Sequence, residues 1–192
     1  MRIVAGTLRG RAIAAPDGEG TRPTIDRVRE ALFSSLYSLR GGFEGAIVLD
    51  AFAGSGALGI EALSRGAKSA VFYERDAKAA KVTHANVKAC GLGASQATIV
   101  QRDIMKAPPT GQVAPFDLVF LDPPYAYDPV EVLAMVCSLS EAGALSDDAI
   151  IVYEHAINTK AEVAQAAEQA GFETIASKKY GKTGVTTLRK PS

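Results

Sequence analysis

From residue 46 onward, short apolar runs alternate with helical patterns, and this alternation limits the possible folds more than any other feature. Strands are expected at residues 47–49, 70–73, 98–100, 116–121, 150–153, 172–180 and 185–188, and helices at residues 57–65, 76–90, 129–140 and 159–170. This spacing predicts a doubly wound, Rossmann-like α/β sheet of about seven strands. Since no helix separates the last two runs, the last strand is expected to be antiparallel.

The first 40 residues precede this alternation. Residues 2–14 alternate loosely around two glycines, which suggests a small β-hairpin, and residues 24–38 carry one apolar face at helical spacing. A chain of 192 residues is of ordinary length for one domain. We therefore expect a single domain, residues 1–192, with an N-terminal hairpin and helix extension (1–40) and an α/β core (41–192).

Composition excludes several classes of protein. The hydrophobic content of 47% is too high for a disordered chain, and no apolar run approaches the roughly 20 residues that span a bilayer. Two cysteines cannot make a disulfide framework or, alone, a structural zinc site. With no signal-peptide pattern at the N-terminus, we expect a cytoplasmic protein without a metal site. His84 and His155 are expected to be solvated or to cap, not to catalyse.

The formal net charge is zero, but the charges are unevenly distributed. Residues 1–40 carry a net charge of +3, residues 41–176 carry −8, and residues 177–192 carry +5. Two basic ends that flank an acidic body suggest a polyanionic partner.

A glycine-rich loop follows the first expected strand. Gly54, Gly56 and Gly59 match the pattern G-x-G-x-x-G, and Glu74 ends the next strand. Glycines let the backbone turn tightly and approach a ligand, and an acid at that position can accept hydrogen bonds from ribose hydroxyls. The pattern alone fits an NAD-dependent oxidoreductase or an enzyme that uses S-adenosylmethionine (SAM). Asp50 favours SAM, because a carboxylate there would repel a pyrophosphate but could face the amino group of SAM.

The fourth expected strand ends in the segment Asp122–Tyr125, with the sequence Asp-Pro-Pro-Tyr. The two prolines make the turn rigid. The carboxylate of Asp122 and the carbonyl of Pro123 can accept the two N–H groups of an exocyclic amine, and Tyr125 can stack on a flipped base. The segment therefore indicates methylation of a base amine by direct transfer.

These two motifs together resemble those of the class I SAM-dependent amino-methyltransferases. Within that class, residues 2–6, 9–11, 21–24, 26–30, 61–67, 74–76 and 180–183 are similar to the signatures of the RsmD-type enzymes. Those enzymes methylate N2 of a guanine in bacterial 16S ribosomal RNA (rRNA), and the resemblance extends from residue 2 to about residue 188. It implies SAM as cofactor and 16S rRNA as partner, within small-subunit particles.

The resemblance also implies roles for individual residues. The catalytic segment would be Asp122, Pro123, Pro124 and Tyr125. SAM would be held by Thr24, Asp50, Ala53, Gly54, Gly56, Glu74, Arg75, Asp103, Ile104 and Asp122. Independently of the resemblance, the basic ends of the chain are expected to neutralise RNA phosphates through Arg2, Arg9, Arg11, Arg22, Lys178, Lys179 and Lys182.

Other functions stay open at this stage. DNA adenine-N6 enzymes and other RNA amino-methyltransferases share the Asp-Pro-Pro-Tyr segment, whereas an oxidoreductase would leave that segment without a role. A nucleic-acid-binding protein without catalysis is a further alternative. No membrane association is expected, and we expect a monomer.

Overall fold

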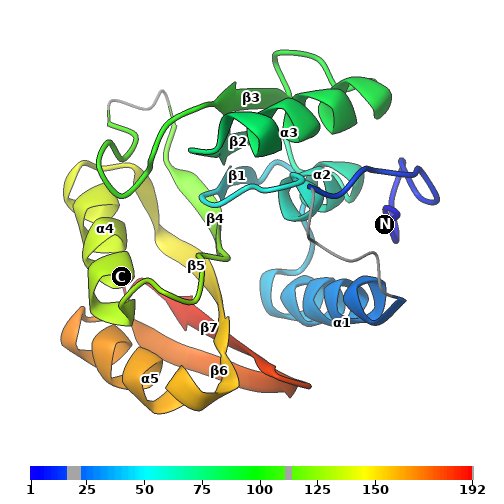
Figure 1. The fold of residues 1–192 in the computed structure, drawn as a ribbon. Coiled ribbons are helices and arrows are strands. Elements are labelled where there is room, and N and C mark those ends of the chain that lie inside the picture. The colour runs from blue at the N-terminus through cyan, green and yellow to red at the C-terminus, as the bar shows by residue number, and fades with distance from the viewer. Residues whose placement is uncertain (17–22, 111–113, 192) are drawn as a thin grey trace. The chain divides into compact units, whose positions relative to one another are not determined.

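A computed structural model of the chain describes residues 1–16, 23–110 and 114–191. The chain divides into two compact units, residues 1–102 and 103–192, and Figure 1 shows the elements of each. No helix in the described ranges is long and apolar enough to cross a membrane.

The first unit contains a three-stranded parallel sheet. Its elements are α1 (Pro23–Arg40), β1 (Ile47–Asp50), α2 (Ala57–Ser64), β2 (Ser69–Tyr73), α3 (Ala77–Ala89) and β3 (Ala97–Val100). The central strand β2 pairs in parallel with both β1 and β3. Helix α2 packs against β1 and β2, and α3 packs against β3. The apolar run in β1 is buried, with Val48 and Leu49 fully inaccessible, as expected of a parallel strand.

The second unit contains a four-stranded mixed sheet. Its elements are β4 (Phe116–Leu121), α4 (Pro129–Glu141), β5 (Leu145–Ala156), a short 3-10 turn η1 (Ile157–Thr159), α5 (Lys160–Gln169), β6 (Glu173–Tyr180) and β7 (Thr183–Arg189). Strands β4 and β5 are parallel, and β7 lies between β5 and β6, antiparallel to both. Helix α5 packs against β6, β7 and α4. Figure 1 shows α5 beside α4.

The structure confirms the seven strands and the antiparallel end of the predicted fold. Two details differ. The expected N-terminal hairpin is reduced to one antiparallel bridge between Arg2 and Ala12, and β5 runs well beyond the predicted residues 150–153. Its polar end pairs with β7 through His155 and Gly184. His155 is buried, with Nε2 2.9 Å from Thr186 Oγ1, so of the two expected alternatives, solvation or capping, solvation is wrong. The single domain stays a prediction.

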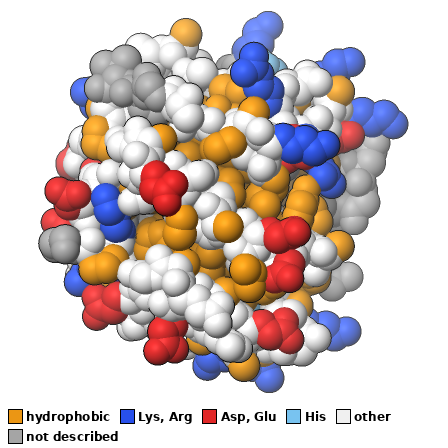
Figure 2. Space-filling view, turned by 90° about the vertical axis from the view of Figure 1, so that its left-hand side faces the viewer, with side chains coloured by type: hydrophobic (Ala, Val, Ile, Leu, Met, Phe, Trp, Pro, Cys, Tyr) orange, Lys and Arg blue, Asp and Glu red, His pale blue; other side chains and the backbone are white. Residues whose placement is uncertain are grey.

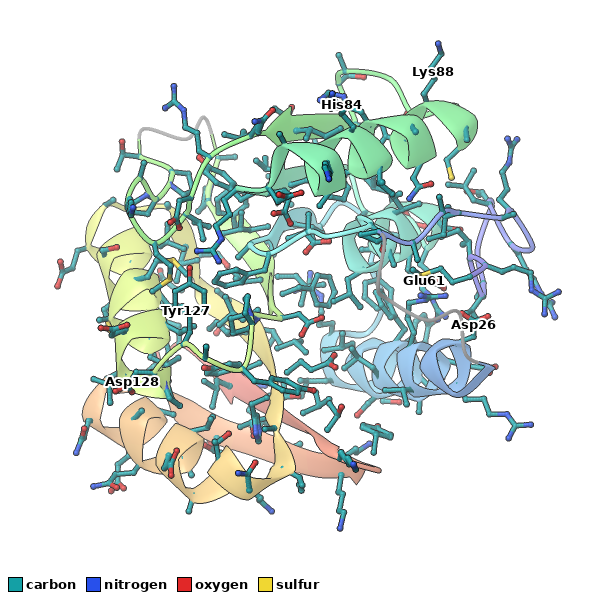
Figure 3. The ribbon with its side chains drawn as sticks, in the orientation of Figure 1. Asp26, Glu61, His84, Lys88, Tyr127 and Asp128 are labelled. Carbon is teal, nitrogen blue, oxygen red and sulfur yellow. The ribbon has the colours of Figure 1, made fainter. Side chains whose placement is uncertain are left out.

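Residues 1–14, here called the N-terminal segment, are anchored to the first unit by one buried carboxylate. Glu61 of α2 is completely inaccessible to solvent. It accepts hydrogen bonds from the backbone N–H groups of Val4, at 2.8 Å, and Ala5, at 3.0 Å. It also pairs with Arg65 Nε at 2.8 Å and Arg29 Nε at 3.5 Å. Figure 3 shows Glu61 in the space between α2 and α1.

Arg29 and Gly6 add further contacts to this anchor. The buried Arg29 of α1 donates from Nη2 to Asp26 Oδ1 at 2.8 Å and to the backbone carbonyl of Arg2. Gly6 has a φ of 81°, and a Cβ at that position would lie 1.8 Å from the carbonyl oxygen of Ser64. Only glycine therefore lets the segment approach α2 so closely.

We predict that Glu61→Ala destabilises the protein by about 3–5 kcal/mol, because it leaves the buried Arg29, the partly buried Arg65 and two amides without this acceptor. The free energy of unfolding, measured by urea titration of the circular dichroism signal, tests this. Glu30→Ala, at an exposed position on α1, is the control and should change stability by less than about 0.5 kcal/mol. Equal losses for the two variants would contradict the anchoring role.

Candidate active site

The glycine loop, residues 51–56, connects β1 to α2. Gly54 and Gly56 have φ angles of 54° and 76°, in the left-handed region that favours glycine. The loop closes on itself through a hydrogen bond of 2.6 Å from Gly56 N to the carbonyl of Ala53. A Cβ on Gly56 would lie 2.9 Å from Thr83 Cγ2. Two of the three glycines in the motif therefore shape the loop itself.

Gly59, the third glycine of the motif, has a packing role. A Cβ at this position would lie 2.3 Å from Cε1 of Phe72 in β2. Its absence lets α2 lie directly on the strand, as in dinucleotide-binding loops, where the third glycine allows close helix–strand packing.

Asp50 ends β1 and is only 2% exposed. Its Oδ2 accepts a hydrogen bond of 3.0 Å from the backbone N–H of Gly59. Burial raises the pKa of Asp50 from 3.8 to about 7; the charge of Glu74 also raises it, while the Gly59 hydrogen bond opposes the shift. A buried carboxyl of this kind is stabilised in its charged form by a nearby cation, such as a ligand amino group.

Glu74 follows β2 directly and hydrogen-bonds the backbone of the glycine loop. Its Oε2 accepts from Gly54 N at 2.9 Å, and its Oε1 accepts from Asp76 N at 2.8 Å. The loop is also tied to β2 by Ala53 N, which donates to the Tyr73 carbonyl at 2.9 Å. A carboxylate has about four acceptor positions, so Glu74 keeps capacity for ligand hydroxyls.

The first unit thus brings together five of the predicted cofactor residues: Asp50, Ala53, Gly54, Gly56 and Glu74. Arg75 is exposed beside them. Thr24 lies in the first turn of α1, but its side chain is outside the described part of the chain.

In the second unit, Asp103 and Ile104 follow β3 in the chain. Asp103 is half-buried, and its Oδ1 accepts from Met105 N at 3.1 Å. Its backbone carbonyl accepts from the N–H groups of residues 106 and 107, which forms a turn. Ile104 is 1% exposed. The turn fixes the direction of the Asp103 carboxylate.

The segment Asp122–Tyr125 begins directly after β4. Pro123 is buried, whereas Asp122 and Pro124 are exposed and the Tyr125 side chain is 59% exposed. The phenol oxygen of Tyr125 lies 3.3 Å from Oγ1 of Thr183, the first residue of β7. The buried Pro123 fixes the turn to the second unit, and the Asp122 carboxylate and the Tyr125 ring on this turn are both accessible to solvent.

The predicted RNA-binding residues within the described ranges are all exposed. Arg2, Arg9 and Arg11 lie on the N-terminal segment, and Lys178, Lys179 and Lys182 lie on β6 and the turn that follows it. Arg22 is outside the described residues. Figure 2 shows acidic and basic side chains interspersed on the face it draws, so that face carries no single sign of charge.

Sequence reasoning assigned no structural role to several residues that organise this site, although Arg29 and Glu61 lie within the stretches that resemble the family signatures. Thr83 and Asn86 of α3 hydrogen-bond the glycine loop, and Glu61 and Arg29 anchor the N-terminal segment. A signal existed for Glu61, the single charge in the otherwise apolar α2 sequence ALGIEALS. Across the described ranges, no group of three or more His, Cys, Asp or Glu residues is placed to hold a metal ion.

We predict that Asp50 makes stability fall as pH rises. Because its pKa is higher in the folded state, about 7, the folded protein binds more protons than the unfolded chain between about pH 4 and pH 7. The free energy of unfolding should decrease there by up to about 1.4 kcal/mol per pH unit relative to Asp50→Asn, and the difference should be constant above that range. Urea titrations of both proteins at several pH values test this, and parallel curves would contradict it.

Comparison with known proteins places the chain in a family. The model of a family described as Conserved hypothetical protein 95 matches residues 1–189. YlbH of Bacillus subtilis (strain 168), named provisionally as an rRNA methyltransferase, is 36% identical over 193 residues, covering 99% of each chain. Ribosomal RNA small subunit methyltransferase D of Haemophilus influenzae is 40% identical over 159 residues, covering 80% of this chain and 78% of that protein.

Solved structures show the same relationship. The structure of yhhF from Escherichia coli, named provisionally as a methyltransferase, has a TM-score of 0.79 and 33% identity, and covers 100% of this chain and 98% of that one. The Rossmann-like α/β fold and the RsmD-type resemblance are thereby confirmed. The chain belongs to the Conserved hypothetical protein 95 family, the RsmD-like methyltransferases.

Proposed function

We propose that this protein transfers the methyl group of SAM to the exocyclic N2 of a specific guanine in 16S rRNA, acting as a cytoplasmic monomer on small-subunit ribosomal particles. The observation that carries the proposal is the rigid, accessible turn Asp122–Tyr125 at the carboxyl end of β4. In open α/β sheets, ligands bind at the carboxyl ends of the strands. The relative from H. influenzae, named as a small-subunit rRNA methyltransferase, supports the choice of substrate.

The residues around the glycine loop suit SAM. Glu74 has acceptor capacity for two ribose hydroxyls, and Gly54 and Gly56 leave room for a ligand to approach the backbone. Asp50, with a pKa of about 7, gains from a nearby ammonium group. Asp103 would accept from the adenine amino group, with Ile104 against the ring, and Thr24 and Arg75 complete the proposed set. SAM supplies an electrophilic methyl group on a sulfonium centre.

Asp122 acts on the target amine. Its carboxylate and the Pro123 carbonyl each accept one N–H of guanine N2, which directs the nitrogen lone pair toward the methyl donor. Tyr125, exposed and restrained at its hydroxyl by Thr183, offers a face on which the flipped base stacks. The work of these residues is positioning and electrostatic stabilisation.

We predict that Asp122→Ala lowers turnover by at least about 100-fold, because it removes an acceptor that orients the amine. Binding of SAM should weaken by less than about threefold, since most of the proposed cofactor contacts remain. Purified protein is incubated with labelled SAM and small-subunit particles that lack this methylation, and the methylated nucleoside is identified by mass spectrometry.

The product separates the alternatives. Guanosine methylated at N2 in 16S rRNA supports the proposal, and its loss in Asp122→Ala supports the role of that residue. Methylated adenine in DNA, or a modification of another RNA, would replace the proposed substrate. Wild-type turnover in Asp122→Ala would show that the amine is oriented by other groups.

We predict that RNA binding weakens steeply with salt because exposed basic residues contact phosphates. Lys179→Gln and Lys182→Gln should each reduce the slope of log affinity against log salt by roughly one. Lys160→Gln, at an exposed position on α5, is the matched control and should leave the slope unchanged. Filter binding to 16S rRNA at several salt concentrations measures this, and equal slopes for all variants would contradict it.

A further inference from the structure

Helix α3 presents two polar side chains to the interior of the first unit. Thr83 and Asn86 lie one turn apart, at 0% and 3% exposure, while His84 and Lys88 are exposed. Figure 3 shows Lys88 extending from α3 into solvent. A buried amide or hydroxyl costs free energy unless it is hydrogen-bonded, so the partners of the two inward residues indicate what they do.

Both inward residues hold backbone carbonyls of the glycine loop. Thr83 Oγ1 donates to the carbonyl of Gly54 at 2.8 Å, and Asn86 Nδ2 donates to the carbonyl of Ser55 at 2.8 Å. Because each peptide group is planar, fixing a carbonyl also fixes the N–H of the next residue. The two side chains therefore set the orientation of two successive peptide groups in the loop that we assign to SAM.

Asn86 has a second partner that Thr83 lacks. Its Nδ2 also donates to the carbonyl of Ala14 at 2.9 Å, and its Oδ1 accepts from the backbone N–H of Ala14 at 2.8 Å. The side-chain amide is thus bonded to the glycine loop and to the end of the N-terminal segment at the same time.

The N-terminal segment carries Arg2, Arg9 and Arg11, to which we assign RNA phosphates. Its two ends are joined, since Ile13 N donates to the carbonyl of Met1 at 3.0 Å. Ser55 lies beside both ends, because its Oγ is 3.9 Å from Met1 Sδ and its carbonyl is held by Asn86. A change in the position of the segment therefore reaches the glycine loop through Asn86.

We propose that Asn86 is a positioning residue that couples the N-terminal segment to the glycine loop, so that RNA bound to the segment raises the affinity of the loop for SAM. This inference rests on the proposed function. Coupling between two binding sites is reciprocal, so SAM should tighten RNA binding by the same factor.

The test is the dissociation constant of SAM, measured by calorimetry with and without a 16S rRNA transcript. In the wild type, RNA should lower it by at least about fivefold, the lower end of typical couplings. In Asn86→Ala, the ratio of the SAM dissociation constant without RNA to that with RNA should fall to about one. Unfolding curves of each variant establish that it is folded.

Two further variants separate coupling from loop support. Ala14→Pro removes the N–H that Asn86 Oδ1 accepts but leaves the bonds from Nδ2 to the carbonyls of residue 14 and Ser55. It should therefore reduce the RNA effect while SAM binding without RNA changes by less than about twofold. Thr83→Val removes the bond to Gly54, and a bond of 3.2 Å to the Ala79 carbonyl within α3, but no bond to the N-terminal segment. It should therefore weaken SAM binding with and without RNA and keep the ratio of the two dissociation constants.

The coupling would be overturned if RNA did not change the SAM dissociation constant of the wild type. It would also be overturned if RNA changed that constant in both Asn86→Ala and Ala14→Pro as much as in the wild type. Loss of the ratio in Thr83→Val would also overturn it, because general loosening of the loop would then be the cause. Methyl transfer by the wild type in the same preparations tests the proposed function separately. Turnover without coupling rejects only this inference.

Discussion

The buried carboxylate of Glu61 is the interaction on which the N-terminal part of the protein depends. A fully buried carboxylate is costly unless its charge is paired and its oxygens accept hydrogen bonds. Arg29, Arg65 and two backbone amides meet that requirement together. The partners come from α1, from the end of α2 and from the N-terminal segment, so the pairing fixes where the N-terminal segment lies in the first unit. That placement lets the segment reach Asn86 and, through it, the glycine loop.

The sequence predicted most of the regular structure because local patterns determine it. Continuous apolar runs marked β1 and β4, and the bounds of β4 were predicted correctly at residues 116–121. The pattern failed where pairing between distant segments decides the structure. The end of β5 contains Glu154 and His155, which a strand pattern does not predict, and antiparallel pairing with β7 and the Thr186 hydroxyl accommodate them. The expected hairpin is shorter than a pattern of alternation suggests, again because of distant contacts. Residues 1–3 bond residues 10–13, but the backbone N–H groups of Val4, Ala5 and Thr7 donate to α2 and do not extend the pairing.

In the candidate site, too, local patterns predicted the positions of residues but not their contacts with distant parts of the chain. The positions of Asp50, Glu74 and Asp122 at strand ends followed from the spacing of strands and motifs. Their hydrogen bonds did not, because Glu74 accepts from a residue 20 positions away and Asn86 bonds residues 31 and 72 positions away. No local pattern marks such a residue in an Ala-rich helix. Its role becomes visible only when the backbone groups that need partners are known.

The zero net charge conceals different roles for acids and bases. Asp50, Glu61 and Glu74 accept backbone N–H groups and so organise the interior around the glycine loop. The predicted RNA-binding bases within the described ranges are exposed, as at Arg9 and Lys179. Salt screens exposed charges beyond about 8 Å at physiological ionic strength, so acids elsewhere in the protein cancel little of the attraction between these bases and a phosphate that touches them. The distribution of charge, and not its sum, therefore determines whether this protein can bind RNA.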